Sequence, residues 1–272
     1  PLKRKGSEIM NTSNENISAA HTHIDHIPVA WITPNKRQQP TKLAIWLPYG
    51  TGTKEDMLTY LEQLASAGFL AVSFDPWMHG ERGTGKPPEQ MFTMAISDFR
   101  NSIWPILGLS ALDVLKVIDW ALTEYTITLP VCIGGISLGG DIAVAAAGID
   151  SRIGVVSAIN ATPDWLRPGM HAQGQLVQFR KVEAYAQFFY ENINPLTNLN
   201  GYAECPAITF ECGAEDDHVP PDGALRFQSA LEQIYFEQPD RLRVNLHPNV
   251  GHQAIPAMWQ NSLDWFLTHS NA

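Results

Sequence analysis

Residues 131–139 read Val-Cys-Ile-Gly-Gly-Ile-Ser-Leu-Gly, and this stretch decides the fold. Its first four residues form a short apolar run of the kind found in buried strands. A Gly-x-Ser-x-Gly pattern follows at residues 135–139, and an alanine-rich segment, residues 141–148, comes behind it. Glycines two residues before and after Ser137 let the backbone turn sharply without Cβ clashes. The stretch therefore predicts a strand, a tight turn that exposes the Ser137 hydroxyl, and a helix.

Apolar runs rich in β-branched residues recur along the chain, with helix-forming segments between them. We expect strands over residues 27–33, 43–47, 70–74, 131–134, 154–159, 207–211 and 242–246. We expect helices over residues 54–67, 109–122, 141–148, 222–234 and 254–267. This alternation predicts an α/β fold with a doubly wound, mostly parallel central sheet. The first strand alternates apolar and polar residues, which also suits an antiparallel edge.

Residues 163–200 interrupt the alternation, because they join two strands but are too long for an ordinary connection. They are rich in large side chains, namely Trp165, Met170, His171, Phe179, Tyr185, Phe188, Phe189 and Tyr190. The helical spacing of several of these aromatic residues indicates a short helix pair. Such a small helical insertion either caps a pocket or packs down on the core. The domain prediction is an N-terminal tail or edge segment over residues 1–26 and one α/β domain over residues 27–272.

The chain of 272 residues has a formal net charge of -10 and a pI near 5.3. This balance argues against nucleic acid or an anionic membrane as a partner, because both require a basic surface. One basic cluster, Lys3-Arg4-Lys5, is interpreted as a solvated tail. No apolar stretch is long enough to span a bilayer, so no membrane partner is expected.

The cysteine content argues against a disulfide framework and against a zinc site, since Cys132, Cys205 and Cys212 are too few and too irregularly spaced for either. We interpret Cys132 and Cys212 as small core residues, because both lie in expected strands. Unpaired cysteines favour a reducing compartment and hence a cytoplasmic location.

A serine hydroxyl is a weak nucleophile at neutral pH, and it requires a base that is itself oriented by an acid. In doubly wound hydrolases the acid and the histidine follow the serine in that order along the chain. The loop after strand 207–211 supplies three carboxylates, of which Asp216 is the preferred acid and Asp217 and Glu215 are alternatives. The base is expected to be His252, which follows the last strand and the flexible residue Gly251.

Backbone N–H groups beside the serine are expected to bind the oxyanion of a tetrahedral intermediate. One donor is Leu138, the residue after the serine, at the start of a helix. The second comes from the glycine-containing loop after strand 43–47, with Gly50 as the first choice and Thr51 as the alternative. These groups require neither a metal nor an organic cofactor.

These motifs resemble the α/β-hydrolase superfamily, and more narrowly the dienelactone-hydrolase and prolyl-oligopeptidase-like esterases. The elbow at residues 135–139, the acid loop at 213–220 and Gly251-His252 carry the resemblance, together with the loop at 74–83 that contains His79-Gly80. The chain departs from the pattern of many relatives, since Pro48-Tyr49 stands where they have His-Gly.

The resemblance implies a serine hydrolase that cleaves a small, apolar carboxylic ester through an acyl-enzyme. Lactonase, amidase and thioesterase activities use the same groups and remain open, as does a non-catalytic ligand-binding scaffold. Tyr49, Trp165 and Phe188 are candidate pocket residues, whereas His79 and Arg82 are interpreted as anchors of their loop.

Overall fold

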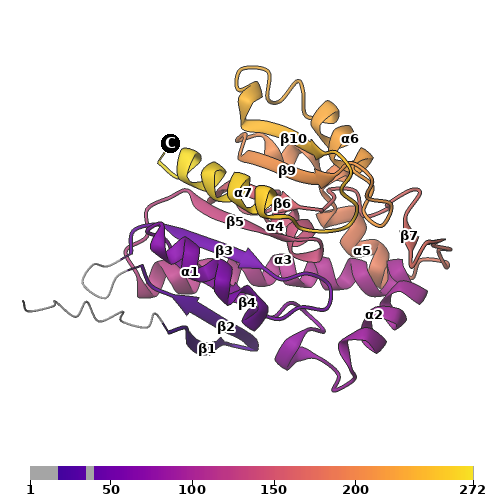
Figure 1. The fold of residues 1–272 in the computed structure, drawn as a ribbon, viewed down its shortest axis with the longest axis horizontal. Helices are drawn as coiled ribbons and strands as arrows, with labels where there is room; N and C mark the ends of the chain where they lie inside the picture. The colour runs from indigo at the N-terminus through magenta and orange to yellow at the C-terminus, as the bar shows by residue number, and fades with distance from the viewer. Residues whose placement is uncertain (1–17, 35–39, 272) are drawn as a thin grey trace, which may run out of the picture.

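The computed structural model describes residues 18–34 and 40–271, and the basic cluster at residues 3–5 lies outside them. One eight-stranded sheet forms the centre of the molecule, in the order β1-β2-β4-β3-β5-β6-β9-β10 (Figure 1). Its strands are β1 (Ala20–Ile24), β2 (Ile27–Ile32), β3 (Leu43–Leu47), β4 (Leu70–Phe74), β5 (Val131–Ile136), β6 (Ile153–Ile159), β9 (Ala207–Gly213) and β10 (Leu242–His247).

All pairings from β4 to β10 are parallel, while β1 pairs antiparallel with β2 and β2 pairs antiparallel with β4. The mostly parallel sheet expected from the sequence is therefore confirmed. The edge itself is β1, a strand that the sequence pattern did not specify, joined to β2 by a tight turn in which Asp25 has a positive φ of 54°.

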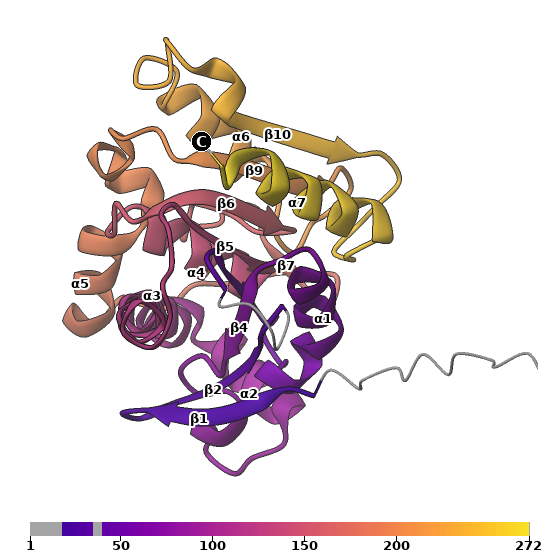
Figure 2. The ribbon, with the colours of Figure 1, turned by 90° about the vertical axis from the view of Figure 1, so that its left-hand side faces the viewer.

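Helices cover both faces of the sheet (Figures 1 and 2). The helices are α1 (Leu58–Ser66), α2 (Pro88–Ser97), α3 (Phe99–Glu124), α4 (Leu138–Ala147), α5 (Ala184–Ile193), α6 (Asp222–Ala230) and α7 (Pro256–His269). Figure 2 shows α3 and α5 on one side of the sheet and α1 and α7 on the other. Single turns of 3-10 helix lie at Lys54–Met57, Gly80–Arg82, Pro195–Thr197, Leu199–Tyr202 and Pro239–Arg241.

Side chains on the two faces of the central strands pack into two separate hydrophobic cores. In β3, Leu43, Ile45 and Leu47 pack under α3 and α4, whereas Ala44 and Trp46 pack under α1 and α7. This separation follows from the two-residue repeat of a strand, which turns successive side chains to opposite faces. Because both faces are covered, every residue of β3 is buried and the strand reads as a continuous apolar run.

The long segment between β4 and β5 differs from the expected helix at residues 109–122. The helix α3 begins ten residues earlier, at Phe99, and contains Pro105. Proline normally disfavours a helix interior, but the first two turns of α3 bury Phe99, Trp104 and Leu107 against the core. A separate helix, α2, precedes α3 and was not expected. Tertiary packing therefore outweighs local propensity in this segment.

The insertion at residues 163–200 contains one α-helix rather than the expected pair. A two-stranded hairpin, β7 (His171–Ala172) with β8 (Gln175–Leu176), precedes α5. The helix α5 packs on α3, where Phe189 contacts Gly108 and the Tyr190 ring stacks on Trp104 with centroids 4.5 Å apart. The helical part of the insertion therefore belongs to the core.

Over residues 18–34 and 40–271, none of the helices combines the length and the apolar character needed to cross a lipid bilayer.

Two neighbouring phenylalanines of α5 provide a test of this packing. Phe189 is 4% exposed and Phe188 is 57% exposed. Phe189→Ala should lower the free energy of unfolding by about 3 kcal/mol, because it leaves a cavity against α3. Phe188→Ala, the matched control, should lower it by less than about 1 kcal/mol. Urea denaturation measures both values, and equal losses would contradict the orientation of α5.

Candidate active site

The order of the strands places a crevice at the carboxyl ends of β3 and β5. The chain runs from β3 outward to β4 and, later, from β5 outward in the other direction to β6. The loops after the adjacent strands β3 and β5 therefore lead away in opposite directions and leave a crevice between them. Ligands of α/β proteins commonly bind at such a reversal of strand order. The loop after β5 is the Ser137 turn, and the loop after β3 contains Gly50 and Thr51.

Ser137 occupies the sharp turn between β5 and α4, with φ 52° and ψ -114°. A positive φ is unfavourable for a residue with a Cβ, so the surrounding structure holds it in place. The Ser137 N–H donates to the Ile159 carbonyl of β6 over 2.8 Å. A Cβ on Gly135 would approach Gly139 to 2.6 Å, and a Cβ on Gly139 would collide with the Leu47 carbonyl. Glycine is therefore required on both sides of the serine.

Three side chains form a continuous chain of hydrogen bonds above this turn. The Ser137 Oγ lies 3.1 Å from His252 Nε2, and His252 Nδ1 lies 2.7 Å from Asp216 Oδ2. The His252 ring is fixed in this direction because its Nδ1–H donates to the carboxylate, which leaves Nε2 free to accept from the serine hydroxyl. The structure thus brings together the serine, histidine and first-choice acid expected from the sequence.

The acid is itself anchored by the backbone of its loop. The second oxygen of Asp216 accepts from the N–H groups of His218 and Val219, at 3.0 and 2.8 Å. Asp216 is 4% exposed. The two alternative acids lie elsewhere: the Asp217 side chain is 66% exposed and lies 3.4 Å from His171, and Glu215 is exposed.

The His79 ring connects the loop after β3 to the loop after β4. Its Nε2 lies 2.8 Å from the Gly50 carbonyl oxygen, and its Nδ1 lies 2.8 Å from the carbonyl oxygen of Trp77. An N–H on either nitrogen donates to the carbonyl that it faces. In a trans peptide the C=O of Gly50 and the N–H of Thr51 point in opposite directions. The contact with His79 therefore also orients the Thr51 N–H.

A buried ion pair fixes the position of the His79 loop. Asp75 is fully buried and accepts from the Lys54 ammonium at 3.0 Å, the Lys54 N–H at 2.9 Å and the Glu81 N–H at 3.0 Å. Arg82 donates to the Asp75 carbonyl and to Asp113 on α3, at 3.1 and 2.8 Å. Each charge has a partner, which is the condition for placing charges in the interior. Arg82 thus anchors its loop in the described structure.

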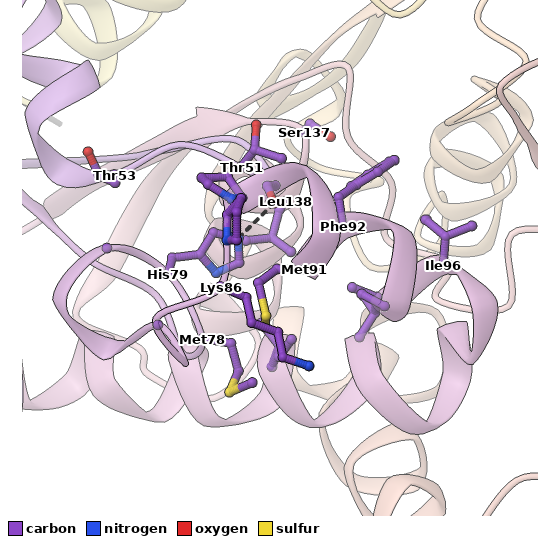
Figure 3. A pocket seen from close by; sticks show the side chains of 18 of the residues that line it. Thr51, Thr53, Met78, His79, Lys86, Met91, Phe92, Ile96, Ser137 and Leu138 are labelled. Carbon is purple, nitrogen blue, oxygen red and sulfur yellow. Dashed lines mark hydrogen bonds between the residues drawn. The ribbon is translucent and has the colours of Figure 1, made fainter.

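Two cavities meet at Ser137. The first has a volume of about 470 Å³ and extends under α2 (Figure 3). The second has a volume of about 620 Å³ and extends along the His252 loop. Five residues line both cavities, namely Gly50, Thr51, Phe92, Ser137 and His218. The serine is therefore accessible from two differently built sides.

The expected pocket residues lie in different places. Tyr49 is 39% exposed and lines the second cavity. Trp165 is fully buried behind the site, and Phe188 is exposed on α5; neither lines the two cavities at Ser137. Phe188 is away from the serine because α5 packs on α3, whereas Trp165, which precedes α5, is a core residue whose carbonyl accepts from the Trp104 indole N–H at 2.8 Å. Their place as pocket walls is taken by α2, whose residues Met91, Phe92, Ala95 and Ile96 line the first cavity.

The sequence carries one signal that points to α2. Pro87-Pro88 stands before an apolar segment of residues 91–96, and proline is favoured at the first position of a helix. The segment was too short and too mixed in polarity to be recognised as a helix by periodicity.

A second buried ion pair lies behind the serine. Asp141, in the first turn of α4, is fully buried, accepts from the Thr162 N–H at 2.7 Å and pairs with Arg167. Arg167 also lines the first cavity. The arginine therefore anchors the helix that begins at the serine.

Among the residues that the structure describes, no cluster of three or more His, Cys, Asp or Glu side chains is arranged to hold a metal ion. The three cysteines are unpaired and buried.

A family model for Peptidase_S9, the Prolyl oligopeptidase family, matches residues 97–272. This match covers more than half of the chain and includes Ser137, Asp216 and His252. The chain belongs to the prolyl oligopeptidase family. The match begins at the last residue of α2 and contains α3 and the elements from β5 to α7, including the loops that carry Ser137, Asp216 and His252.

Known proteins extend the comparison over nearly the whole chain. A Bacillus subtilis (strain 168) protein named "Putative esterase YitV" is 24% identical over 258 residues, which cover 88% of this chain and 93% of that protein. The crystal structure of TT1662 from Thermus thermophilus has a TM-score of 0.72 and 22% identity, and covers 94% of this chain and 99% of its own.

A structure titled "Putative Dienelactone Hydrolase" from Klebsiella pneumoniae subsp. pneumoniae MGH 78578 has a TM-score of 0.65 and 17% identity, and covers 93% of this chain and 99% of its own. At these identities the solved structures show the α/β-hydrolase fold. Membership of the prolyl oligopeptidase family identifies the chain as a hydrolase.

His218 links the site of this prolyl oligopeptidase family member to the pH dependence of its stability. Burial lowers the pKa of His218 to about 4, and its Nδ1 lies 2.8 Å from the His171 carbonyl oxygen. The unfolded chain takes up this proton near pH 6.5, so the unfolded state binds more protons between pH 6.5 and about 4. Stability should therefore fall as the pH falls through this range.

The variant His218→Gln should lose this dependence while keeping an N–H donor for the His171 carbonyl. Urea denaturation between pH 4 and 7 gives the free energy of unfolding at each pH. The slope of this free energy against pH should be steeper for the unsubstituted protein than for His218→Gln, by up to one proton or about 1.4 kcal/mol per pH unit. Parallel slopes for the two proteins would show that His218 titrates alike in the folded and unfolded states.

Proposed function

We propose that the chain is a serine hydrolase that cleaves carboxylic esters through an acyl-enzyme intermediate. The observation that carries the proposal is the hydrogen-bonded chain from Ser137 through His252 to Asp216. The relative named as an esterase supports an ester as the substrate. A binding scaffold has no need for a strained serine, a base in contact with it and a buried acid behind the base.

In the first half of the reaction, Ser137 Oγ attacks the carbonyl carbon while His252 Nε2 accepts the hydroxyl proton. Asp216 stabilises the imidazolium and keeps the ring oriented. Collapse of the tetrahedral intermediate breaks the ester bond, and His252 returns the proton to the leaving alcohol. In the second half, His252 deprotonates water, which attacks the acyl-enzyme. As the tetrahedral intermediate collapses and the bond to Ser137 Oγ breaks, His252 returns the proton to Ser137 Oγ and the carboxylic acid leaves. The net reaction consumes one ester and one water.

Two backbone N–H groups would bind the oxyanion. The Leu138 N–H lies at the N-terminus of α4, where unpaired N–H groups and the helix dipole favour negative charge. For the second donor we favour Thr51 over Gly50, because the contact between His79 and the Gly50 carbonyl orients the Thr51 N–H before substrate binds. Preorganised donors stabilise the transition state without reorganisation during the reaction.

Removal of the nucleophile tests the proposal directly. Ser137→Ala should lower kcat on p-nitrophenyl butyrate by about 10⁴-fold or more, because the chemical steps depend on its oxygen. It should also abolish labelling by a fluorophosphonate. Ser229→Ala, on the exposed surface of α6, is the control and should retain both activities. Unchanged turnover in Ser137→Ala would exclude the mechanism. Lactones, thioesters and aminoacyl nitroanilides would show in the same assays which bond is cleaved fastest.

The role of His79 gives a separate prediction. His79→Ala should lower kcat about 10- to 100-fold with little change in KM, because the oriented N–H acts on the transition state. The affinity for a trifluoromethyl ketone, which forms a tetrahedral oxyanion on the serine, should fall by a similar factor. His79→Gln, which keeps a donor for the Gly50 carbonyl, should recover part of the loss.

Rates in this experiment should be expressed per active site, with the sites titrated by a fluorophosphonate. A purely structural role of His79 would lower the number of titrated sites and leave the kcat of each site unchanged. That outcome would remove His79 and the Thr51 peptide from the proposed mechanism.

A further inference from the structure

We propose that the substrate joins an apolar acyl group to a polar, hydroxyl-bearing alcohol, with the acyl group in the cavity under α2 and the alcohol in the cavity beside His252. This inference rests on the proposed ester hydrolysis and names the class of substrate for the same site. It follows from which residues line each cavity and from where the leaving group must receive its proton.

The position of His252 indicates which half of the ester each cavity would hold. His252 lines the second cavity and is not among the residues that line the first, whereas Leu138 lines the first and is not among those that line the second. The leaving oxygen must lie within hydrogen-bond reach of His252 Nε2 to receive its proton. The alcohol therefore extends into the second cavity, and the acyl chain extends past Leu138 into the first.

The acyl cavity has mainly apolar walls. Side chains from α2, α3 and the loop before α2 surround it, namely Met78, Met91, Phe92, Ala95, Ile96, Phe99, Ile103 and Ile106. Figure 3 shows Phe92 and Ile96 of α2 on one side, with Thr51 of the loop after β3 and His79 of the loop after β4 on the other. Transfer of an acyl chain from water to such walls stabilises the complex in proportion to the apolar surface that is buried. The flexible methionines fit acyl groups of different shape.

The alcohol cavity presents polar groups from several loops. Asn160 follows β6, His171 and Gln173 belong to the β7–β8 hairpin, and Asp217 follows the acid. Tyr49 and Tyr60 complete the lining on the opposite side with their phenol rings. Amide, imidazole, carboxylate and phenol groups provide hydrogen bonds for the hydroxyls of a polyol, while Ile136, Phe92 and Ala254 supply the apolar part of the lining.

A row of rings separates the two cavities. Phe92 of α2 and His218 line both, with ring centroids 6.0 Å apart, and the His218 ring lies 4.8 Å from that of His252. Because the pKa of His218 is lowered to about 4 by burial, this ring is neutral at pH 7. The row connects α2 to the His252 loop above the serine, so an ester that binds must place its two halves on opposite sides.

Two isomeric esters test the assignment. Glycerol mono-octanoate has an apolar acyl group and a polar alcohol, and octyl glycerate reverses them with the same atoms. We expect kcat/KM for glycerol mono-octanoate to exceed that for octyl glycerate by about 10-fold or more, after correction for their rates of alkaline hydrolysis. Equal values, or a preference for octyl glycerate, would overturn the inference.

A narrowed cavity provides the second test. Ala95→Phe adds a ring to the α2 wall of the acyl cavity and should lower the ratio of kcat/KM for glycerol mono-octanoate to glycerol monoacetate about 10-fold. Thr93→Phe, on an exposed position of the same helix, is the matched control and should leave this ratio unchanged. An unchanged ratio in Ala95→Phe would place the acyl chain elsewhere.

Fluorophosphonate labelling separates failure of the inference from failure of the proposed function. If Ser137 is not labelled and neither isomer is hydrolysed, the ester hydrolase mechanism itself fails. If Ser137 is labelled and the isomers are hydrolysed equally, or neither is hydrolysed, the mechanism of activation stands and the proposed substrate class is wrong.

Discussion

The conformation of Ser137 is the constraint on which the rest of the site depends. With φ at 52°, the serine reverses the chain between β5 and α4 and directs its hydroxyl away from the sheet. The Ser137 N–H binds the β6 carbonyl, and the glycines two residues before and after the serine leave room for this turn. The same turn places the Leu138 N–H at the N-terminus of α4, so the proposed nucleophile and a proposed oxyanion donor arise from one backbone feature.

The other groups reach the serine on loops held by buried charges. Asp216 is held by two backbone N–H groups, and it orients His252 in turn. On the opposite side, the buried Asp75 holds the loop that carries His79. These contacts are internal to the protein and form without substrate. They are the kind of preorganisation that allows electrostatic stabilisation of a transition state, because no dipole has to turn during the reaction.

The residues that would select the substrate and the residues proposed to carry out the reaction come from different parts of the fold. Ser137, Asp216 and His252 follow strands of the central sheet, whereas much of the cavity lining comes from α2 and from the β7–β8 hairpin. Both elements lie in segments that connect β4 to α3 and β6 to α5, where length changes leave the sheet intact. This separation agrees with the low identity between this chain and solved structures that share its fold.

The sequence by itself determined the elements whose signal is local. The Gly-x-Ser-x-Gly turn requires its glycines for steric reasons, the buried strands are continuous apolar runs, and the order of Ser137, Asp216 and His252 follows the order of strands. It favoured Gly50 over Thr51 as the second oxyanion donor, whereas we propose Thr51, because the direction of this peptide group depends on its contact with His79. Only the tertiary structure decided which side chains meet across the cavities. Trp165 and Phe188 are as aromatic as Phe92, but Trp165 is buried in the core and Phe188 lies on α5, which packs on α3. The position of α2 brings Phe92 to the cavities at Ser137. The sequence gives the type of each side chain, but the neighbours of that side chain depend on how the helices pack. Helix packing in turn depends on contacts between residues far apart in the chain.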